Sequence, residues 1–400
     1  TRILSAAVLA AFAYAPGALA ADTIILGAAV SLTGKYTTDG EHTKRGYDLA
    51  VEAINNAGGV KVGDKNYMLE VKYYDDESTP ARGAELAERL IRQDGVKLLL
   101  GPYSSGMTKA MGPVTEKFEV PMVQANGASR SLFTNGWKYM FATLSTSEQY
   151  LASAIALAAE NADKLGKDAK EITVALAFEN DPFSQDVRAG VLDDAKKFGM
   201  KVVIDDQLPR ELNDMAATLT KVKALKPDIL IVSGHAKGAA TAVRQIDEMK
   251  VQVPILAMTH CDSADITGKF GDAANYTLCA TQWAPTMTYK DDLFGSSGDY
   301  AKKFQEKFGY EPPYQAAESS AAVMVFADAI SRAGSADAKP VRDALAATDL
   351  PTFYGQIKFD ETGKNIAKPM ALYQVIDGQF KVVAPTNAAE VPAIVPRPSM

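Results

Sequence analysis

Two short turns rich in hydroxyl and N–H donors are the residues of this chain best suited to chemistry. They are Tyr103-Ser104-Ser105-Gly106 and Asn126-Gly127-Ala128-Ser129, and each follows an apolar stretch that predicts a strand. Because a helix N-terminus presents unpaired N–H groups and serine adds a hydroxyl, such turns can hold a carboxylate without a side-chain cation. Alternatively, Ser105 and Ser129 only cap the helices that follow them. The sequence supports both interpretations equally.

The motifs of the common catalytic and cofactor-binding sites are missing from the sequence. It has no G-x-G-x-x-G after a strand, no Walker A motif, no G-x-S-x-G elbow and no H-E-x-x-H pair. One group has metal-ligating residue types, His260-Cys261-Asp262, but adjacent side chains are too crowded to surround one ion well. We therefore expect neither an enzyme nor a bound cofactor or metal.

Strands and helices must position the two turns, and they alternate along the chain. Apolar or alternating patterns predict strands at residues 24–29, 69–73, 96–100, 120–125, 172–178, 201–205, 228–232 and 254–258. Patterns with helical spacing, ended by glycine or proline, predict helices at residues 44–57, 185–198, 214–225 and 237–250, and one that begins at Pro80. This alternation is typical of parallel sheets covered by helices on both faces.

Length and composition agree with a soluble protein of two domains. A chain of 400 residues exceeds one comfortable hydrophobic core. The blocks of alternating elements predict two doubly wound α/β lobes. The net charge of −7, with no basic stripe on any predicted helix, gives no support for binding to nucleic acid or an anionic membrane.

The N-terminal segment has the composition of a secretory signal peptide. Arg2 precedes an apolar, alanine-rich stretch that ends in Ala18-Leu19-Ala20. The stretch is too short and too weakly apolar for a good membrane span. We expect residues 1–21 to be removed after Ala20 or Ala21, which places the mature protein in the periplasm.

An ordered set of short motifs runs along nearly the whole mature length of the chain: Ser31-Leu32-Thr33-Gly34, Gly40, Gly46, Leu49-Ala50, Ile54-Asn55, Gly58-Gly59-Val60, Asp75-Asp76, Pro80-Ala81, Gly101-Pro102-Tyr103-Ser104-Ser105, Ala128-Ser129, Gly355, Phe359-Asp360 and Gly363. In these motifs the chain resembles branched-chain-amino-acid-type solute-binding proteins of ABC importers. The resemblance implies a type I periplasmic binding protein, with a hinge and a cleft between the lobes. Lobe one would hold residues 22–143 and 283–350, lobe two residues 144–282 and 351–392, and residues 393–400 would form a tail.

Carried over from the family, the site would grip a ligand carboxylate through the Ser105 and Ser129 hydroxyls and N–H groups. Tyr103 and Ser104 would lie beside it, and the Ala128 carbonyl would face a ligand ammonium. Phe183 and His235 stand where relatives often have a pocket tyrosine.

His260 or Asp262 falls where an acidic residue usually pairs with the ammonium. If His260 takes this place, a ligand without an ammonium, such as an aromatic or oxo acid, becomes reasonable. If Asp262 or Asp39 reaches the cleft, an amino acid is the better candidate.

Two aromatic residues and the cysteines complete the expectations. Trp283 would lie near a lobe crossing, either against an apolar ligand tail or buried between the lobes, and Tyr36 would lie at the cleft rim. Cys261 and Cys279 are the two cysteines of the chain. An oxidising compartment permits a disulfide between them, but the sequence does not give their separation.

The expected function is that of a monomeric receptor that closes around a small carboxylate-bearing solute, with an amino acid as first candidate. The receptor would deliver this solute to the membrane permease of an ABC transporter. An aromatic acid, an oxo acid or an amide is the alternative ligand. A sensor that controls a regulator is the alternative function.

Overall fold

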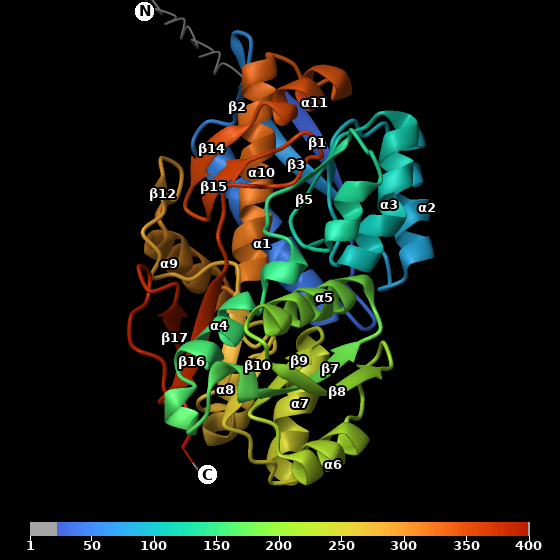
Figure 1. Ribbon diagram of the computed structural model, residues 1–400. Coiled ribbons are helices and arrows are strands. Elements are labelled where there is room, and N and C mark those ends of the chain that lie inside the picture. Colours follow the sequence, from blue (N-terminus) through green and yellow to red (C-terminus); the bar gives the residue numbers. More distant parts are fainter. Residues whose placement is uncertain (1–21, 399–400) are drawn as a thin grey trace, which may run out of the picture.

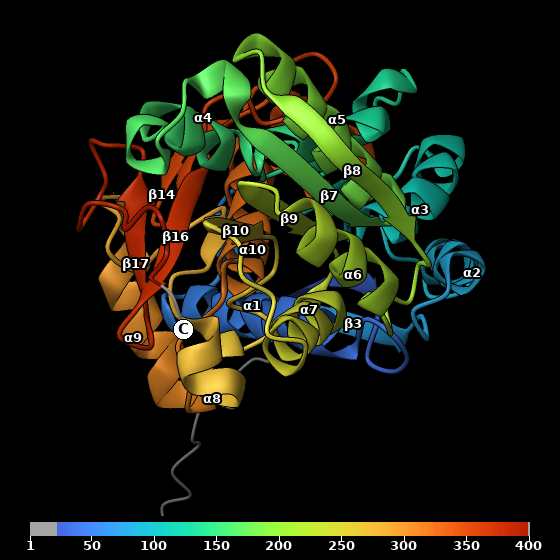
Figure 2. The same cartoon turned by 60° about the horizontal axis from the view of Figure 1, so that its bottom comes forward.

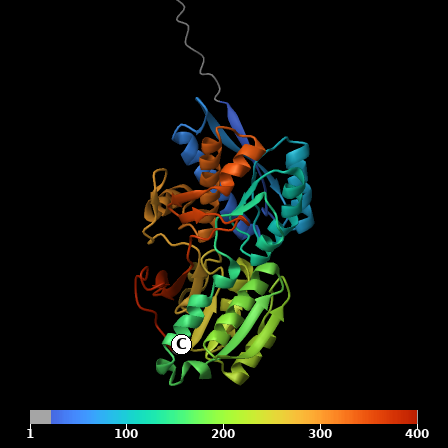
Figure 3. The same ribbon diagram turned by 45° about the horizontal axis from the view of Figure 1, so that its top comes forward.

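The computed structural model describes residues 22–398, which form two α/β lobes stacked end to end (Figures 1 and 3). The predicted signal segment, residues 1–21, lies outside the described residues. Within residues 22–398 we find no helix with the length and apolar character needed to cross a membrane.

Lobe one is built on a six-stranded sheet in the order β2-β3-β1-β4-β5-β6, in which every neighbouring pair except β2 and β3 is parallel. The strands are β1 (Thr23–Val30), β2 (Val60–Val62), β3 (Lys65–Asp75), β4 (Leu99–Leu100), β5 (Met122–Gln124) and β6 (Met140–Ala142). Two pairs of helices pack on this sheet: α1 (Thr37–Asn56) with α10 (Tyr314–Ala333), and α2 (Pro80–Arg92) with α3 (Ser105–Phe118).

Lobe two is built on a seven-stranded sheet in the order β17-β16-β11-β10-β9-β7-β8. Its strands are β7 (Thr173–Glu179), β8 (Lys201–Leu208), β9 (Ile229–Ser233), β10 (Ile255–Met258), β11 (Leu278–Thr281), β16 (Ala371–Ile376) and β17 (Gln379–Ala384). The first five are parallel, whereas β16 and β17 add an antiparallel edge. The helices are α4 (Ala152–Glu160), α5 (Pro182–Lys197), α6 (Ala216–Leu225), α7 (Ala236–Glu248) and α8 (Ile266–Phe270), with α5 facing lobe one (Figures 1 and 2).

A segment between the two parts of lobe two completes lobe one. It holds α9 (Ser297–Phe308), α11 (Ala338–Ala346) and the hairpins β12 (Lys290–Asp291) with β13 (Gly295–Ser296) and β14 (Asp349–Thr352) with β15 (Gly355–Lys358). Phe353 stacks on Tyr300 with ring centroids 3.9 Å apart, and Lys364 pairs with Ala142 of β6. The chain therefore returns to lobe two after Lys364, later than the predicted boundary at residue 350, because this hairpin adds to the lobe-one core.

Most predicted elements occur close to their predicted positions, but α1 begins at Thr37, seven residues before the predicted start at Lys44. There are three further differences. The strand predicted at residues 96–100 is reduced to β4. The helix expected after Ser129 is only a short 3-10 turn, η1 (Arg130–Thr134). The described part of the predicted tail packs on lobe two, where the Arg397 N–H donates to the Pro254 carbonyl over 2.9 Å.

The chain crosses between the lobes three times, and Gln282, which lies in one of these crossing passages, is hydrogen-bonded to residues of the other two. Its side chain accepts from the Ser145 N–H over 3.2 Å and donates to the Ser145 carbonyl over 2.9 Å. The Lys368 ammonium donates to the Gln282 carbonyl, and the Ser145 hydroxyl donates to the Lys368 carbonyl over 2.6 Å. One residue of each passage thus belongs to a single buried hydrogen-bond network, which is where a hinge would bend.

Candidate functional site

A small polar cavity lies between the lobes, beside the N-terminus of α3. Six predicted site residues line it together with five others: Tyr103, Ser105, Ala128, Phe183, His235 and His260, with Asn126, Tyr150, Tyr314, Gln315 and Glu318. Its volume is about 10 Å³, which is room for about one water molecule. A ligand of amino-acid size therefore needs a wider cleft than this closed arrangement offers.

A chain of hydrogen bonds crosses the cavity from one lobe to the other. The Tyr103 hydroxyl, from lobe one, lies 2.7 Å from Nδ1 of His235 and 2.9 Å from Nε2 of His260, both from lobe two. Nε2 of His235 is 3.1 Å from Oδ2 of Asp181. A carboxylate only accepts, so this nitrogen carries the proton. The Tyr103 hydroxyl has a single proton, so it donates to one of the two rings and accepts from the other.

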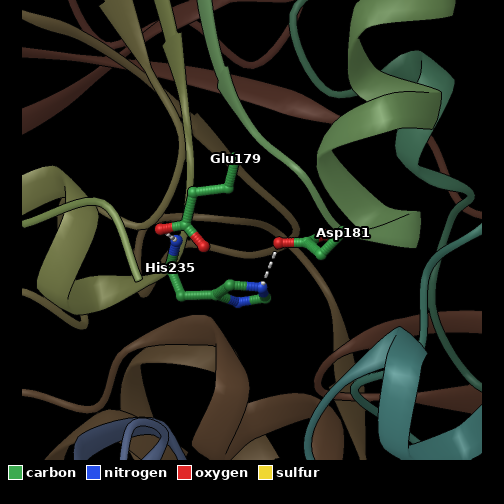
Figure 4. A group of neighbouring side chains, drawn as sticks. All are labelled: Glu179, Asp181 and His235. Carbon is green, nitrogen blue, oxygen red and sulfur yellow. Dashed lines mark hydrogen bonds and ion pairs between the residues drawn. The ribbon is translucent and has the colours of Figure 1, made fainter. Parts of the chain in front are cut away.

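Charged groups continue this chain behind His235 (Figure 4). Oε1 of Glu179 accepts from the main-chain N–H of His235 over 3.3 Å, and Oε2 forms a 2.5 Å ion pair with Lys35 of lobe one. Burial alone would raise the pKa of Asp181, but the charge and hydrogen bond of His235 lower it to about 2. Burial also lowers the pKa of His260 well below its usual range, so this ring is neutral.

Glu179, Asp181 and His235 have the residue types of a metal site, with ligand atoms within 4.8 Å of one another. The Lys35 ammonium supplies positive charge to the same group, since it is bound to Glu179 and also donates to the Arg210 carbonyl. The arrangement is therefore complete as an ion-pair network. Cys261 is in a disulfide, so it is unavailable as a thiolate ligand beside His260 and Asp262.

Ser105 and Ser129 lie next to each other in the structure. In the described chain, neither side chain caps the helix that follows it. The Ser105 hydroxyl accepts from the Ser129 N–H over 3.0 Å and lines the cavity. The Ser129 hydroxyl donates to Oδ2 of Asp186 in α5 over 2.5 Å, across the lobe boundary. Ser104 is buried at the start of α3, and the Ala128 carbonyl accepts from the Ser147 N–H over 2.8 Å.

The two predicted acids are not among the residues that line the cavity. Asp39 is buried near the start of α1, and its Oδ2 accepts from the Ala236 N–H over 3.4 Å. Asp262 lines a separate groove of about 560 Å³ between the lobes, and its Oδ2 accepts from the Tyr314 N–H over 3.2 Å. Burial raises the pKa of Asp262 to about 6. Of the two ammonium candidates, His260 is therefore the one that faces the cavity.

The two remaining aromatic candidates are both buried, in different places. Tyr36 packs edge-on against Tyr103 and His235, with centroid distances of 5.4 and 4.8 Å, so it covers the cavity-lining rings. The Trp283 indole packs edge-on against Tyr300 and Phe353, and its N–H donates to the Phe353 carbonyl over 3.0 Å. The structure thus places Trp283 in the lobe-one core instead of against the ligand cavity.

A disulfide joins Cys261 to Cys279 with a Cα–Cα distance of 5.9 Å. It links the turn after β10 to strand β11, next to His260. The backbone of His260 has φ of +61°, a left-handed conformation that is unfavourable for residues other than glycine. The disulfide therefore fixes a strained turn that holds His260 against Tyr103.

Helix α10 brings residues to the cavity that the sequence analysis missed. Tyr314, Gln315 and Glu318 project from its first turns, and burial raises the pKa of Glu318 well above its usual range. The Tyr354 hydroxyl lies 3.1 Å from Oε2 of Glu318 and 3.3 Å from Oε1 of Gln282, so the cavity is connected to the hinge. The available signal was a glutamine and a glutamate three residues apart in the first turns of this helix, among alanine and serine residues.

Two α/β lobes, joined by three passages and enclosing a polar cavity, define a ligand receptor of the two-lobed type. The chain belongs to the periplasmic binding protein family, which matches residues 23–379. This family has a solute-binding receptor fold. The family resemblance inferred from the short motifs is confirmed, and so is the predicted fold class.

Named relatives and solved structures agree with this family. The chain is 26% identical to the leucine-, isoleucine-, valine-, threonine- and alanine-binding protein of Pseudomonas aeruginosa, over 91% of this chain and 92% of that protein. The fold is similar to that of LivJ from Streptococcus pneumoniae in complex with isoleucine, with a TM-score of 0.78, 22% identity and coverage of 91% and 100%. It is also similar to a solute-binding protein from R. palustris in complex with benzoate, with a TM-score of 0.77, 20% identity and coverage of 93% and 97%.

Proposed function

We propose that this protein is a periplasmic solute receptor that binds a small carboxylate-bearing ligand between its lobes and delivers it to an ABC permease. The observation that carries the proposal is the polar cavity, to which both lobes contribute, at the N-terminus of α3. The first-turn N–H groups of a helix have no partners within the helix and favour an anion. The Ser105 hydroxyl adds a further group beside them.

The mechanism we propose is hinge closure around the ligand. A ligand that contacts both lobes stabilises the closed form relative to the open form. The ligand would enter the open cleft, and closure would bring the lobe-two rings Phe183, His235 and His260 onto it. The protein would act as a monomer and without catalysis, and the closed form would be the one that the permease binds.

An amino acid is the first candidate ligand, as in the names of several relatives. Glu318 is the carboxyl group that lines the cavity and can face an ammonium. A carboxylate without an ammonium is the second candidate. It is favoured by His260 on the opposite wall and by the raised pKa of Glu318. A carboxyl group with a raised pKa tends to remain protonated and uncharged, so it pairs less well with an ammonium.

Binding of L-leucine and of its oxo-acid counterpart, measured by calorimetry and thermal shift, tests the proposal. At a hundredfold excess over Kd, a true ligand should add about 2.7 kcal/mol to the free energy of unfolding. If an amino acid is the ligand, Glu318→Gln should weaken binding of leucine and leave that of the oxo acid unchanged. Asp262→Asn is the matched control and should change neither.

A panel of amino acids, aromatic acids and oxo acids that all leave the melting temperature unchanged would refute a carboxylate ligand. If Glu318→Gln lowers the affinity for leucine and for its oxo acid equally, Glu318 acts through the hinge instead of contacting an ammonium.

A further inference from the structure

Two buried side chains on the lobe-one wall of the cavity have polar atoms that are not satisfied. Among residues 22–398, Oδ1 of Asn126 and both Nε2 and Oε1 of Gln315 have no hydrogen-bond partner. Asn126 is 7% exposed and Gln315 is fully buried, and both line the cavity. Buried polar groups in proteins are nearly always paired, so an unpaired cluster facing a cavity indicates a partner that binds there.

The neighbouring serine fixes which polar atom of Asn126 is left without a partner. The Ser319 hydroxyl donates its single proton to the main-chain carbonyl of Gln315 over 2.6 Å. It can therefore only accept from Asn126, whose amide nitrogen lies 3.0 Å away. Oδ1 of Asn126 is consequently an acceptor in need of a donor. Gln315 offers one further acceptor and two N–H donors in the same cavity.

We infer that Asn126 and Gln315 form a second subsite of the cleft, which binds an uncharged polar group of the ligand such as a hydroxyl or a carboxamide. Such a group both donates and accepts, which matches an acceptor beside an amide. Neither side chain carries a charge that could compensate a buried ion. This inference rests on the proposed function, because the carboxylate end of the same ligand would lie at Ser105.

Two ligand pairs that differ at one hydroxyl test the subsite by calorimetry: L-threonine with its isostere L-valine, and 4-hydroxybenzoate with benzoate. We expect the hydroxylated member of the pair that binds to have a Kd at least tenfold lower than its apolar partner. In Gln315→Leu this preference should fall to less than threefold, while the apolar member binds as well as before or better. Met324→Leu, a buried change further along α10, is the control and should keep the wild-type preference.

The outcomes separate this inference from the proposed function. Tight binding of acids with no preference for the hydroxyl would overturn the subsite, leave the receptor function intact and assign the unpaired atoms to a buried water. No binding of any carboxylate would overturn both. The melting temperature of unliganded Gln315→Leu should be unchanged or higher, since the substitution removes unpaired buried atoms. A large decrease in this melting temperature, with an equal loss of affinity for both members of the ligand pair, would show that Gln315 supports the fold instead.

Discussion

The Ser105 hydroxyl accepts from the Ser129 N–H and also lines the cavity, so its removal has two separable effects. Ser105→Ala should weaken binding of the carboxylate ligand by about 1.5–3 kcal/mol, the range for a hydrogen bond to a charged group. The free energy of unfolding of the unliganded protein should fall less, by about 0.5–1.5 kcal/mol. Calorimetry and chemical denaturation measure the two effects.

Thr115→Val supplies the control for Ser105→Ala, since Thr115 is a buried residue of the same helix whose hydroxyl donates to the Gly112 carbonyl over 2.9 Å. It should change stability and leave affinity intact. If Ser105→Ala behaves in the same way, Ser105 is a structural residue and the anion lies elsewhere.

At the scale of single residues, the sequence predicted which turns meet but not how their side chains pair. The carboxyl ends of neighbouring parallel strands lie at one edge of a sheet, so Tyr103, Ser105 and Ala128 could be placed together. The family resemblance, and no local pattern, placed His235 in the same site. The partners of Ser129 and Asp262 depend on how the lobes close on each other, which no local pattern encodes. Gln315 was missed because helical periodicity alone does not tell a buried polar residue from a solvated one.

At the scale of elements, the disulfide between the β10 turn and strand β11 is the feature most open to experiment. A double substitution of Cys261 and Cys279 to alanine should lower the free energy of unfolding by about 2–4 kcal/mol, the usual effect of removing a disulfide. Ligand affinity should fall as well, because the turn that carries His260 loses its constraint. Urea denaturation and calorimetry measure both quantities.

Wild-type protein treated with reducing agent is the companion measurement for the double variant and should match it. Equal stability of the oxidised protein and the double variant would show that the disulfide contributes nothing to the fold.

The elements themselves were the part most readily predicted from sequence. Strands such as β7 and β9 and helices such as α5 and α7 have strong periodicity and clear end signals, so their predicted positions were close. The antiparallel edge β16–β17 and the β14–β15 hairpin were missed. Each acquires its place by pairing with distant segments, as β16 does with β11.

At the scale of the whole molecule, the closed form contains an ion pair that needs no ligand, between Lys35 of lobe one and Glu179 of lobe two. Glu179→Gln leaves Lys35 without its counter-ion, and opening then lets the ammonium be solvated. We expect closure to become less favourable by about 2–5 kcal/mol, the usual effect of truncating one partner of a buried charge pair. Ligand-free Glu179→Gln should therefore show a larger radius of gyration in X-ray scattering and a higher Kd.

Asp247→Asn removes an exposed ion pair with Lys250 inside lobe two and is the control for this effect. It should leave the radius of gyration and the Kd unchanged. A Glu179→Gln protein with wild-type values of both would mean that the ion pair does not contribute to closure.

The described chain begins at the outer end of lobe one, beside β1, and its last residues pack at the outer end of lobe two (Figure 1). The two ends therefore lie far from the hinge, where a rotation between the lobes produces its largest displacement. Fluorophores attached at these ends would convert hinge bending into a change in energy transfer. The hinge motion that closes the lobes around a solute would then make the protein a genetically encodable optical sensor. Its signal, the energy transfer between the two fluorophores, would need no change to the residues of the cleft.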